Sequence, residues 1–234
     1  SCGWSLSQSV CRSGRFPTFE TLLDVLPDII DQSAYSRDTK SDYTGALVTR
    51  VKSLTNGVNG QIFCSAGKPV QLFDGNVIVD LSRVGSMETK ALLMGILMIQ
   101  LQERRMSEGI GPNASLRHVT VLEEAHNLLR RTSPEQSAES GNLQGKSVEM
   151  LANAIAEMRT YGEGFIIADQ APGLLDMAVI RNTNTKILLR LPEDSDRRLT
   201  GSAARLTEEQ TAELSRLEQG IAAVFQNHWL EPVL

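Results

Sequence analysis

The chain has 234 residues, which is long enough for one large α/β domain with its own core. Its composition, 41% hydrophobic and 22% charged, excludes a disordered or fibrous protein. The formal net charge of -5 and the pI near 5.3 exclude a surface coated with nucleic-acid contacts, so any DNA contact must come from a local patch or a pore loop. The cysteines lack metal-site spacing, and the longest apolar run, residues 91–101, is too short to span a bilayer. We therefore expect a cytoplasmic protein without a membrane partner.

Residues 1–60 are expected to form a linker and a small helical subdomain. The first part, residues 1–17, is polar and rich in serine. Thr18 is suited to cap a helix with a kink or break at Pro27, and a second helix is predicted over residues 41–54. No chemistry is evident in these helices.

From residue 61 to residue 234, strand-like and helix-like patterns alternate, which predicts βαβ units and a mainly parallel sheet flanked by helices. The fold class is therefore α/β. The expected strands are short apolar runs, at residues 61–64, 76–81, 118–122, 165–169 and 184–191. We expect all but the first of these strands to lie in one sheet.

Helices and one long loop are expected between the strands. Residues 87–106 are apolar nearly all round, which predicts a helix buried on several sides. Residues 125–131 and 147–161 also have helical patterns. Residues 132–146 are polar and contain proline and glycine, which predicts a mobile loop.

The C-terminal residues carry two local signals. Thr207 and Gln210 have the spacing of a capping box, which predicts a helix that ends before Gly220. Residues 221–226 and 229–234 are both strand-like and predict a final hairpin.

The most informative stretch is HVTVLEEAH, residues 118–126, in which a predicted strand runs directly into Glu123 and Glu124. Ligands of parallel α/β sheets sit outside the carboxyl ends of the strands. Two acids at that position are suited to hold a metal ion and to polarise a water, which are two tasks of a nucleoside-triphosphate site. The structural alternative is that both acids lie in the first turn of a helix, where the helix dipole favours negative charge.

Four segments in this order resemble the C-terminal half of the HerA/FtsK superfamily of hexameric P-loop ATPases, and its HerA-like members in particular. They are VIVDLS, VTVLEEAHNLL, AEMRTYGEGFIIADQAP and IRNTNTKILLRLPEDSD, within residues 76–233. The resemblance implies that the chain holds part of a RecA-like P-loop NTPase core. It also implies ATP and Mg²⁺ as cofactors and a homo-oligomeric ring, with a hexamer expected.

The resemblance further implies roles for individual residues. Glu123 and Glu124 match the Walker B segment, so Glu123 would act on Mg²⁺ through water and Glu124 would be the general base. Gln170 matches the polar residue that senses the γ-phosphate. Arg159 matches an arginine that reaches a nucleotide, sometimes that of a neighbouring subunit. Arg181 is a further candidate for binding the nucleotide.

Each of these residues also has a structural alternative. Gln170 could simply close a strand, and Arg159 could be a solvated cation beside the C-terminal dipole of a helix. Arg181 and Arg190 could be structural or interface residues. His126 is expected to pack or cap rather than to bind a metal, because no second His or Cys has ligand spacing.

The phosphate-binding loop of such ATPases, G-x-x-x-x-G-K-[ST] after a strand, has no match in the sequence. Residues 60–68 have the wrong glycine spacing, and Pro69 stands where a hydroxyl is required. Residues 141–147 (GNLQGKS) are one residue short and follow a polar loop, so we interpret them as unrelated to phosphate binding. We therefore expect a C-terminal piece of a longer ATPase, or a degenerate relative, that does not hydrolyse ATP alone.

Three functions compete at this point. The first is the Walker B and sensor part of an ATP-driven motor that translocates or unwinds DNA, with a nuclease or other effector as partner. The second is a secretion or conjugation ATPase that moves protein, which the acidic pI favours. The third is a non-catalytic assembly or regulatory module with a vestigial nucleotide site. Glu123, Glu124 and Gln170 together argue against the third.

Overall fold

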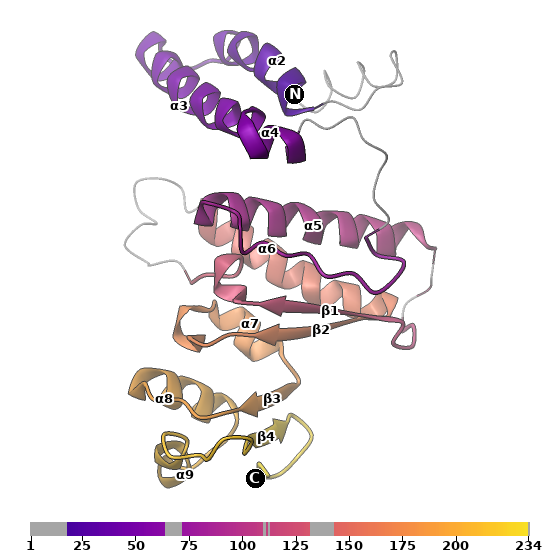
Figure 1. Cartoon of the computed structure of the whole chain (residues 1–234), viewed down its shortest axis with the longest axis vertical. Coiled ribbons are helices and arrows are strands. Elements are labelled where there is room, and N and C mark those ends of the chain that lie inside the picture. Colours follow the sequence, from indigo (N-terminus) through magenta and orange to yellow (C-terminus); the bar gives the residue numbers. More distant parts are fainter. Residues whose placement is uncertain (1–17, 64–71, 110, 112, 132–142, 234) are drawn as a thin grey trace. The chain divides into compact units, whose positions relative to one another are not determined.

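The structure is a computed structural model (Figure 1), and it describes residues 18–63, 72–109, 111, 113–131 and 143–233. The chain divides into two units, Ser1–Gln71 and Leu72–Leu234. Within the described ranges, no helix combines the length and the apolar character that a bilayer span requires.

The described part of the first unit is helical and consists of α2 (Phe19–Asp31), α3 (Arg37–Thr55) and α4 (Gly57–Phe63). Thr18 caps α2 as predicted, through a reciprocal capping box with Thr21, and Pro27 lies inside a helix that continues past it. The helix expected at residues 41–54 is confirmed as part of α3. The strand expected at residues 61–64 is wrong for residues 61–63, which belong to α4, because a short apolar run is compatible with either periodicity.

The second unit is built around a small parallel sheet. β1 (His118–Glu123) pairs with β2 (Glu163–Ala168) in a register that sets His118 opposite Glu163 and Glu123 opposite Ala168. The strands expected at residues 118–122 and 165–169 are therefore confirmed, although β2 begins two positions early. Between them the chain runs through α6 (Leu143–Met158) and the single turn η3 (Arg159–Tyr161).

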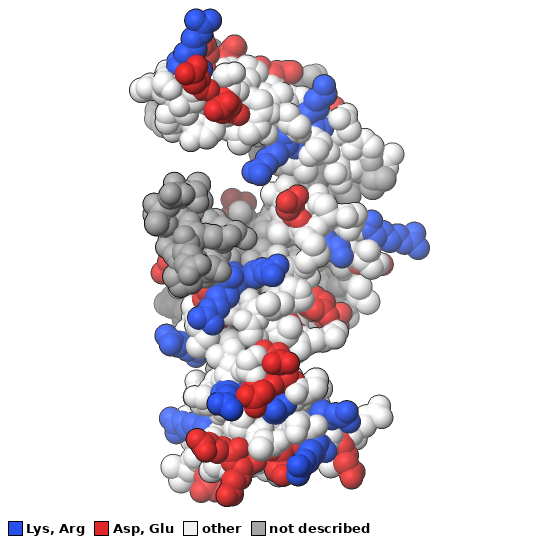
Figure 2. Space-filling view, turned by 90° about the vertical axis from the view of Figure 1, so that its left-hand side faces the viewer, with Lys and Arg blue, Asp and Glu red and all other residues white. Residues whose placement is uncertain are grey.

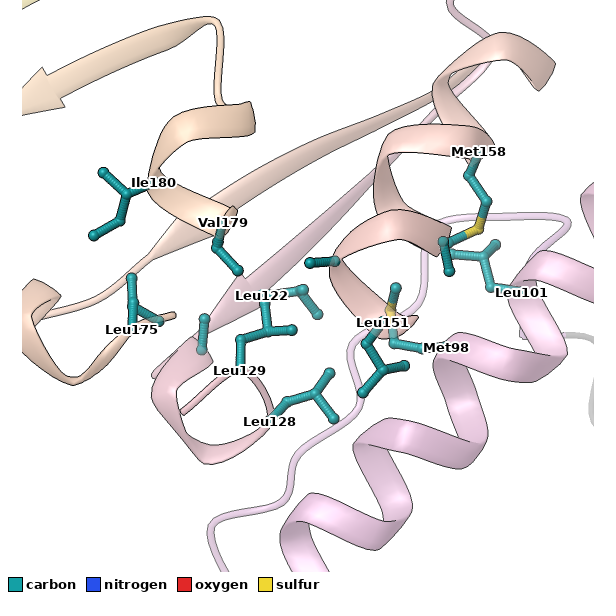
Figure 3. Close-up of a cluster of buried hydrophobic side chains, with 13 residues drawn as sticks. Met98, Leu101, Leu122, Leu128, Leu129, Leu151, Met158, Leu175, Val179 and Ile180 are labelled. Atoms are coloured by element: carbon teal, nitrogen blue, oxygen red, sulfur yellow. The ribbon is translucent and has the colours of Figure 1, made fainter. Parts of the chain in front are cut away.

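Side chains from the sheet and from three helices meet in one hydrophobic core. The helices are α5 (Met87–Ser107), α6 and α7 (Met177–Asn182). Figure 3 shows how the core side chains of these elements converge, among them Met98, Leu101, Leu122, Leu129, Leu151, Met158 and Val179. The helix expected at residues 87–106 is confirmed as α5. Residues 91–97 of α5 are all partly buried, as the uniformly apolar sequence predicted, whereas Ile99 is exposed.

The prediction of one larger parallel sheet is wrong. Residues 76–81 form no strand, and the side chain of Ile78 is 96% exposed. β3 (Thr185–Leu188), which the sequence did predict as a strand, pairs antiparallel with β4 (Ala223–Gln226) in a separate sheet. Apolar and β-branched residues favour an extended backbone, but a strand also needs a neighbour to pair with, and composition does not identify that neighbour.

One face of the β1–β2 sheet has no covering layer among the described residues. Val119, Val121 and Ile166 on this face are exposed, whereas Leu122 and Ile167 belong to the core on the other face. Parallel sheets are usually covered on both faces. The apolar face is therefore a conspicuous feature of this unit.

The C-terminal part of the second unit has its own small core, formed by Leu188, Ala204, Leu214, Ala223 and Phe225. It contains the helices α8 (Asp194–Ala203) and α9 (Glu208–Glu213). The predicted capping box of Thr207 and Gln210 is confirmed at the start of α9. The predicted final hairpin is confirmed in part, because Val224 and Val233 exchange backbone hydrogen bonds of 2.7 and 2.9 Å.

The connection after β1 differs from the prediction. The helix expected at residues 125–131 is wrong, since only the single 3-10 turn η1 (Ala125–Asn127) forms. The range predicted for the mobile loop, residues 132–146, is too long at its end, because residues 143–146 are already part of α6. The rest of that loop, residues 132–142, lies outside the described residues.

Candidate functional site

The candidate site lies at the carboxyl ends of β1 and β2, where parallel α/β sheets bind their ligands. Because the strands are in parallel register up to Glu123 and Ala168, the residues that follow, Glu124 and Asp169, begin two neighbouring turns. Figure 2 views the face toward which these strands point and shows acidic and basic side chains interspersed on the second unit.

Glu124 has a left-handed backbone, with φ 49° and ψ 49°. This conformation costs a non-glycine residue roughly 1–2 kcal/mol, so neighbouring interactions must stabilise it. Asn127 does so, because both its backbone N–H and its side-chain Nδ2 donate to the Glu124 carbonyl oxygen at 2.9 Å. Beyond Glu124 the backbone forms the single 3-10 turn η1 in place of the helix that the sequence predicted.

The side chains of Glu124 and Gln170 meet across the two turns. Gln170 Nε2 donates a hydrogen bond of 2.7 Å to Glu124 Oε1, so the prediction that both residues lie at the same sheet edge is confirmed. The Glu124 side chain keeps 44% of its surface exposed. A carboxylate and a carboxamide in this arrangement can together orient a water, one as acceptor and the other as donor.

Asp169 is a member of the site that the sequence reasoning missed. Its side chain is only 3% exposed, and it accepts hydrogen bonds from the backbone N–H groups of His126 at 2.8 Å and Ala171 at 2.9 Å. The imidazole Nδ1 of His126 also lies 3.0 Å from Asp169 Oδ2. One signal was present: an acid at the end of the strand next to the one that ends in Glu123 and Glu124.

Three of these residues offer the donor atoms of a metal ligand set. Ligand atoms of Glu124, His126 and Asp169 lie within 4.8 Å of one another. Glu123, the residue expected to serve Mg²⁺ through water, ends β1 with an exposed side chain that makes no hydrogen bond or ion pair to any described residue. The carboxylate oxygens at this edge are ligands that Mg²⁺ prefers, whereas the imidazole nitrogen of His126 suits a transition metal such as Zn²⁺.

The predicted arginines lie elsewhere. Arg159 belongs to η3, immediately before β2, and is therefore at the opposite, amino end of the strand from Gln170. Arg181 is exposed in the last turn of α7, and Arg190 is exposed beyond β3. Their side chains form no ion pair with any residue in the described ranges. Within one chain, the structure does not bring Arg159 to the Glu124 cluster.

The amino ends of the strands hold a second polar cluster, centred on the fully buried side chain of Glu163. This carboxylate accepts hydrogen bonds from Arg105 Nε at 2.8 Å and Thr120 Oγ1 at 2.6 Å, and it lies 2.8 Å from His118 Nδ1. Burial alone would raise the pKa of Glu163, but the hydrogen bonds from Thr120, His118 and Arg105 outweigh it and lower the pKa. The cluster faces the core, so we interpret it as structural.

No protein-family model matches the chain. Over 110 residues, 47% of the chain, it is 33% identical to the DNA double-strand break repair helicase HerA of Sulfolobus acidocaldarius and covers 20% of that protein. Over 215 residues, 89% of the chain, it is 25% identical to the protein of the same name from Sulfurisphaera tokodaii and covers 40% of it. The chain thus spans less than half the length of either relative. These similarities indicate a distant, HerA-like relationship at the level of the superfamily.

Proposed function

We propose that this chain supplies the Walker B and sensor part of an ATP-hydrolysing, HerA-like motor that translocates or unwinds DNA. The observation that carries the proposal is the 2.7 Å hydrogen bond between Gln170 and Glu124 at the carboxyl ends of adjacent parallel strands. A base and a hydrogen-bond donor in contact at an accessible sheet edge are suited to hold one attacking water. The distant similarity to two HerA helicases supports the same function.

Each acid has a separate task in this proposal. Glu123, with its exposed carboxylate, would hold Mg²⁺ through a bound water, and Glu124 would accept the proton of the attacking water. Gln170 keeps that water aligned through its carboxamide. When bound with ATP, Mg²⁺ would neutralise charge on the phosphate oxygens.

Arg159 and Arg181 act on a nucleotide held by a neighbouring subunit. Both side chains are exposed and unpaired among the described residues, and Arg159 lies at the far end of β2 from Gln170. A guanidinium that reaches a phosphate across an interface requires a head-to-tail contact between copies, and such contacts form a ring when the rotation between copies closes. The proposed assembly is therefore a homo-oligomeric ring, taken as a hexamer.

A RecA-like core would be completed by polypeptide outside the described residues. The uncovered apolar face formed by Val119, Val121 and Ile166 supports this, since parallel sheets are normally covered on both faces. The β- and γ-phosphates need a glycine-rich loop between a strand and a helix. Residues 145–147 lie within α6 itself, so the proposal assigns phosphate binding to another segment.

A second candidate is an ATPase of related build that moves protein. The net charge of -5 and the interspersed charges in Figure 2 favour this candidate over a motor whose surface is covered with DNA-binding residues. DNA dependence separates the two candidates. A DNA motor shows salt-sensitive DNA binding and DNA-stimulated turnover, and a protein-moving ATPase shows neither.

The test is ATP turnover of the full-length native protein with and without double-stranded DNA, in wild type and in Glu124→Gln. We expect DNA to stimulate the wild type, and Glu124→Gln to lower turnover by about 10²–10⁴-fold, because the carboxamide cannot act as a base. A Glu193→Gln variant, at the N-cap of α8 and outside the site, is the matched control and should retain turnover. Full activity in Glu124→Gln would refute the proposal, and turnover without any DNA response would favour the second candidate.

A further inference from the structure

The buried carboxylate of Asp169 connects the two turns that carry Glu124 and Gln170. It follows β2, yet it accepts the backbone N–H of His126, which follows β1, at 2.8 Å. On its other oxygen it accepts the N–H of Ala171 at 2.9 Å. A carboxylate that is only 3% exposed costs free energy unless donors surround it, and these bonds supply the donors.

These hydrogen bonds hold the backbone next to both residues of the proposed catalytic pair, Glu124 and Gln170. Gln170 lies between Asp169 and Ala171, so the Asp169–Ala171 bond closes a tight turn around it. Glu124 lies two positions before His126, whose backbone is tied to the same carboxylate. Asp169 therefore ties the turn that carries Glu124 to the turn that carries Gln170, although among the described residues no hydrogen bond joins its carboxylate to either side chain.

The same carboxylate orients the imidazole of His126. Its Nδ1 lies 3.0 and 3.2 Å from the two oxygens of Asp169 and 3.5 Å from Glu124 Oε2. A ring nitrogen that faces carboxylate oxygens must carry the proton, because two acceptors cannot share a hydrogen bond without one. His126 is thus held with Nδ1 as donor, and in a neutral ring Nε2 is then the acceptor nitrogen.

We infer that Asp169 is a positioning residue of this site, which aligns Glu124 with Gln170 and fixes His126 in its Nδ1–H form. The inference rests on the proposed function only in taking Glu124 and Gln170 as the reacting pair. The positioning itself is a property of the folded chain. It makes two predictions that can be measured separately, one on the imidazole tautomer and one on turnover.

The first measurement is long-range ¹H–¹⁵N NMR of the three histidine side chains in the labelled chain, with His126→Gln identifying the His126 signals. We expect neutral His126 to be in the Nδ1–H form in the wild type and to revert to the commoner Nε2–H form in Asp169→Asn. The matched control is Asp176→Asn, which removes a carboxylate that caps α7 by accepting from Ala178 at 2.8 Å but leaves Asp169 intact.

The Nε2–H form in the wild type would overturn the inference, and this result needs no variant to fold. Zn²⁺ that displaces the Nδ1 proton at stoichiometric concentration would also overturn it, because Glu124, His126 and Asp169 would then form a metal site. Retention of the Nδ1–H signal when Zn²⁺ is added supports positioning.

The second measurement is steady-state ATP turnover of the full-length protein. We expect Asp169→Asn to lower kcat by about 10–100-fold with little change in KM, as for other residues that orient a reacting group. Asp176→Asn should keep its kcat. If Glu124→Gln abolishes turnover but Asp169→Asn leaves kcat unchanged, the inference fails and the proposed function stands. If Glu124→Gln leaves turnover intact while the NMR result holds, the proposed function fails and the positioning stands.

Discussion

Arg105 and Glu163 form a buried ion pair of 2.8 Å between α5 and the first residue of β2. Their side chains are 7% and 0% exposed. The other Arg105 nitrogens reach Glu108 Oε1 at 3.0 Å and the Phe73 carbonyl at 3.4 Å, so the guanidinium joins α5 to both the sheet and the segment before the helix. The amino ends of the strands are held by polar contacts, whereas the proposed reacting groups lie at the carboxyl ends.

We predict that Glu163→Gln strongly destabilises the chain. The substitution removes the buried carboxylate that pairs with Arg105 Nε and leaves Glu108, at 3.0 Å, as the remaining counter-ion among the described residues. Breaking a buried ion pair typically costs about 3–5 kcal/mol. The measurement is the free energy of unfolding from urea titration. Glu213→Gln is the control, because its ion pair with Arg216 is largely exposed and should be worth at most about 1 kcal/mol. Equal effects of the two substitutions would contradict the assigned role of the buried pair.

The same cluster predicts a loss of stability in acid. Burial opposes ionisation of Glu163, but hydrogen bonds from Thr120, His118 and Arg105 prevail and hold its pKa below the ordinary value of 4.5. A lowered pKa in the folded state contributes stability above the unfolded-state pKa, and this contribution is lost as the pH falls through the folded-state pKa. The free energy of unfolding of the wild type should therefore fall as the pH drops below about 4.5.

Urea titrations of the wild type and of Glu163→Gln across that pH range measure this contribution. The variant should lose less stability with acid than the wild type, since it has no carboxylate to protonate at this position. Parallel pH profiles for the two proteins would show that other acids cause the loss.

The contact between Glu124 and Gln170 is predictable from sequence because carboxyl ends of paired parallel strands share an edge. The inward orientation of Asp169 is not predictable, because its donors, the N–H groups of His126 and Ala171, are brought to it only by the folded turns. The burial of Glu163 is not predictable from sequence for a similar reason. A glutamate at the start of a strand usually faces solvent, and its partner Arg105 lies 58 positions away.

Strand composition predicts β1 and β2 but not the size of the sheet. Residues 76–81 and β3 have a similar apolar character, yet among the described strands only β1 and β2 pair in parallel. Pairing depends on which segment lies alongside, a tertiary property that composition does not encode. The position of Arg159, in contrast, is predictable from the sequence once β2 is known. Because Arg159 lies just before β2, it must be at the opposite edge of the sheet from Gln170.

The two acids after β1 should differ in nucleotide binding. In the full-length protein, Glu123→Gln should weaken Mg²⁺-dependent ATP binding more than Glu124→Gln does, because a neutral amide is a poorer partner for the metal's water shell. Glu124→Gln keeps its size and hydrogen bonding and should leave affinity nearly unchanged. Calorimetric titration with a non-hydrolysable ATP analogue, with and without Mg²⁺, measures the difference. A larger affinity loss in Glu124→Gln would reverse the two roles.

From the left-handed backbone at Glu124 we predict a difference in stability between two variants that does not depend on activity. Glu124→Gly and Glu124→Ala both remove the carboxylate, so they differ only in backbone freedom and in one methyl group. At φ 49° glycine is unstrained, and we expect it to be more stable than alanine by about 1 kcal/mol after its greater unfolded-state entropy is counted. Urea unfolding of both variants provides the comparison. A more stable alanine variant would mean that the turn relaxes once the Glu124–Gln170 bond is lost.

Action of Arg159 across a subunit interface can be tested by mixing subunits. Glu124→Gln and Arg159→Ala should each be nearly inactive as pure assemblies, the first without a base and the second without the guanidinium that reaches the neighbouring site. Equal mixing creates interfaces in which an intact Glu124 from one variant faces an intact Arg159 from the other. In a ring with one type of head-to-tail contact, about a quarter of the interfaces would carry this pairing.

The ATP turnover rate of the mixture should therefore be far above the sum of the rates of the two pure variants. Arg198→Ala, which removes an exposed arginine paired with Asp194 on α8, is the matched control and should be active without mixing. An inactive mixture whose subunits demonstrably exchange would show that Arg159 does not act in a neighbour's site. Because η3 precedes β2 and Gln170 follows it, action within the same chain would require the arginine to reach past the whole strand. The mixing experiment thus tests the ring and the placement of Arg159 together.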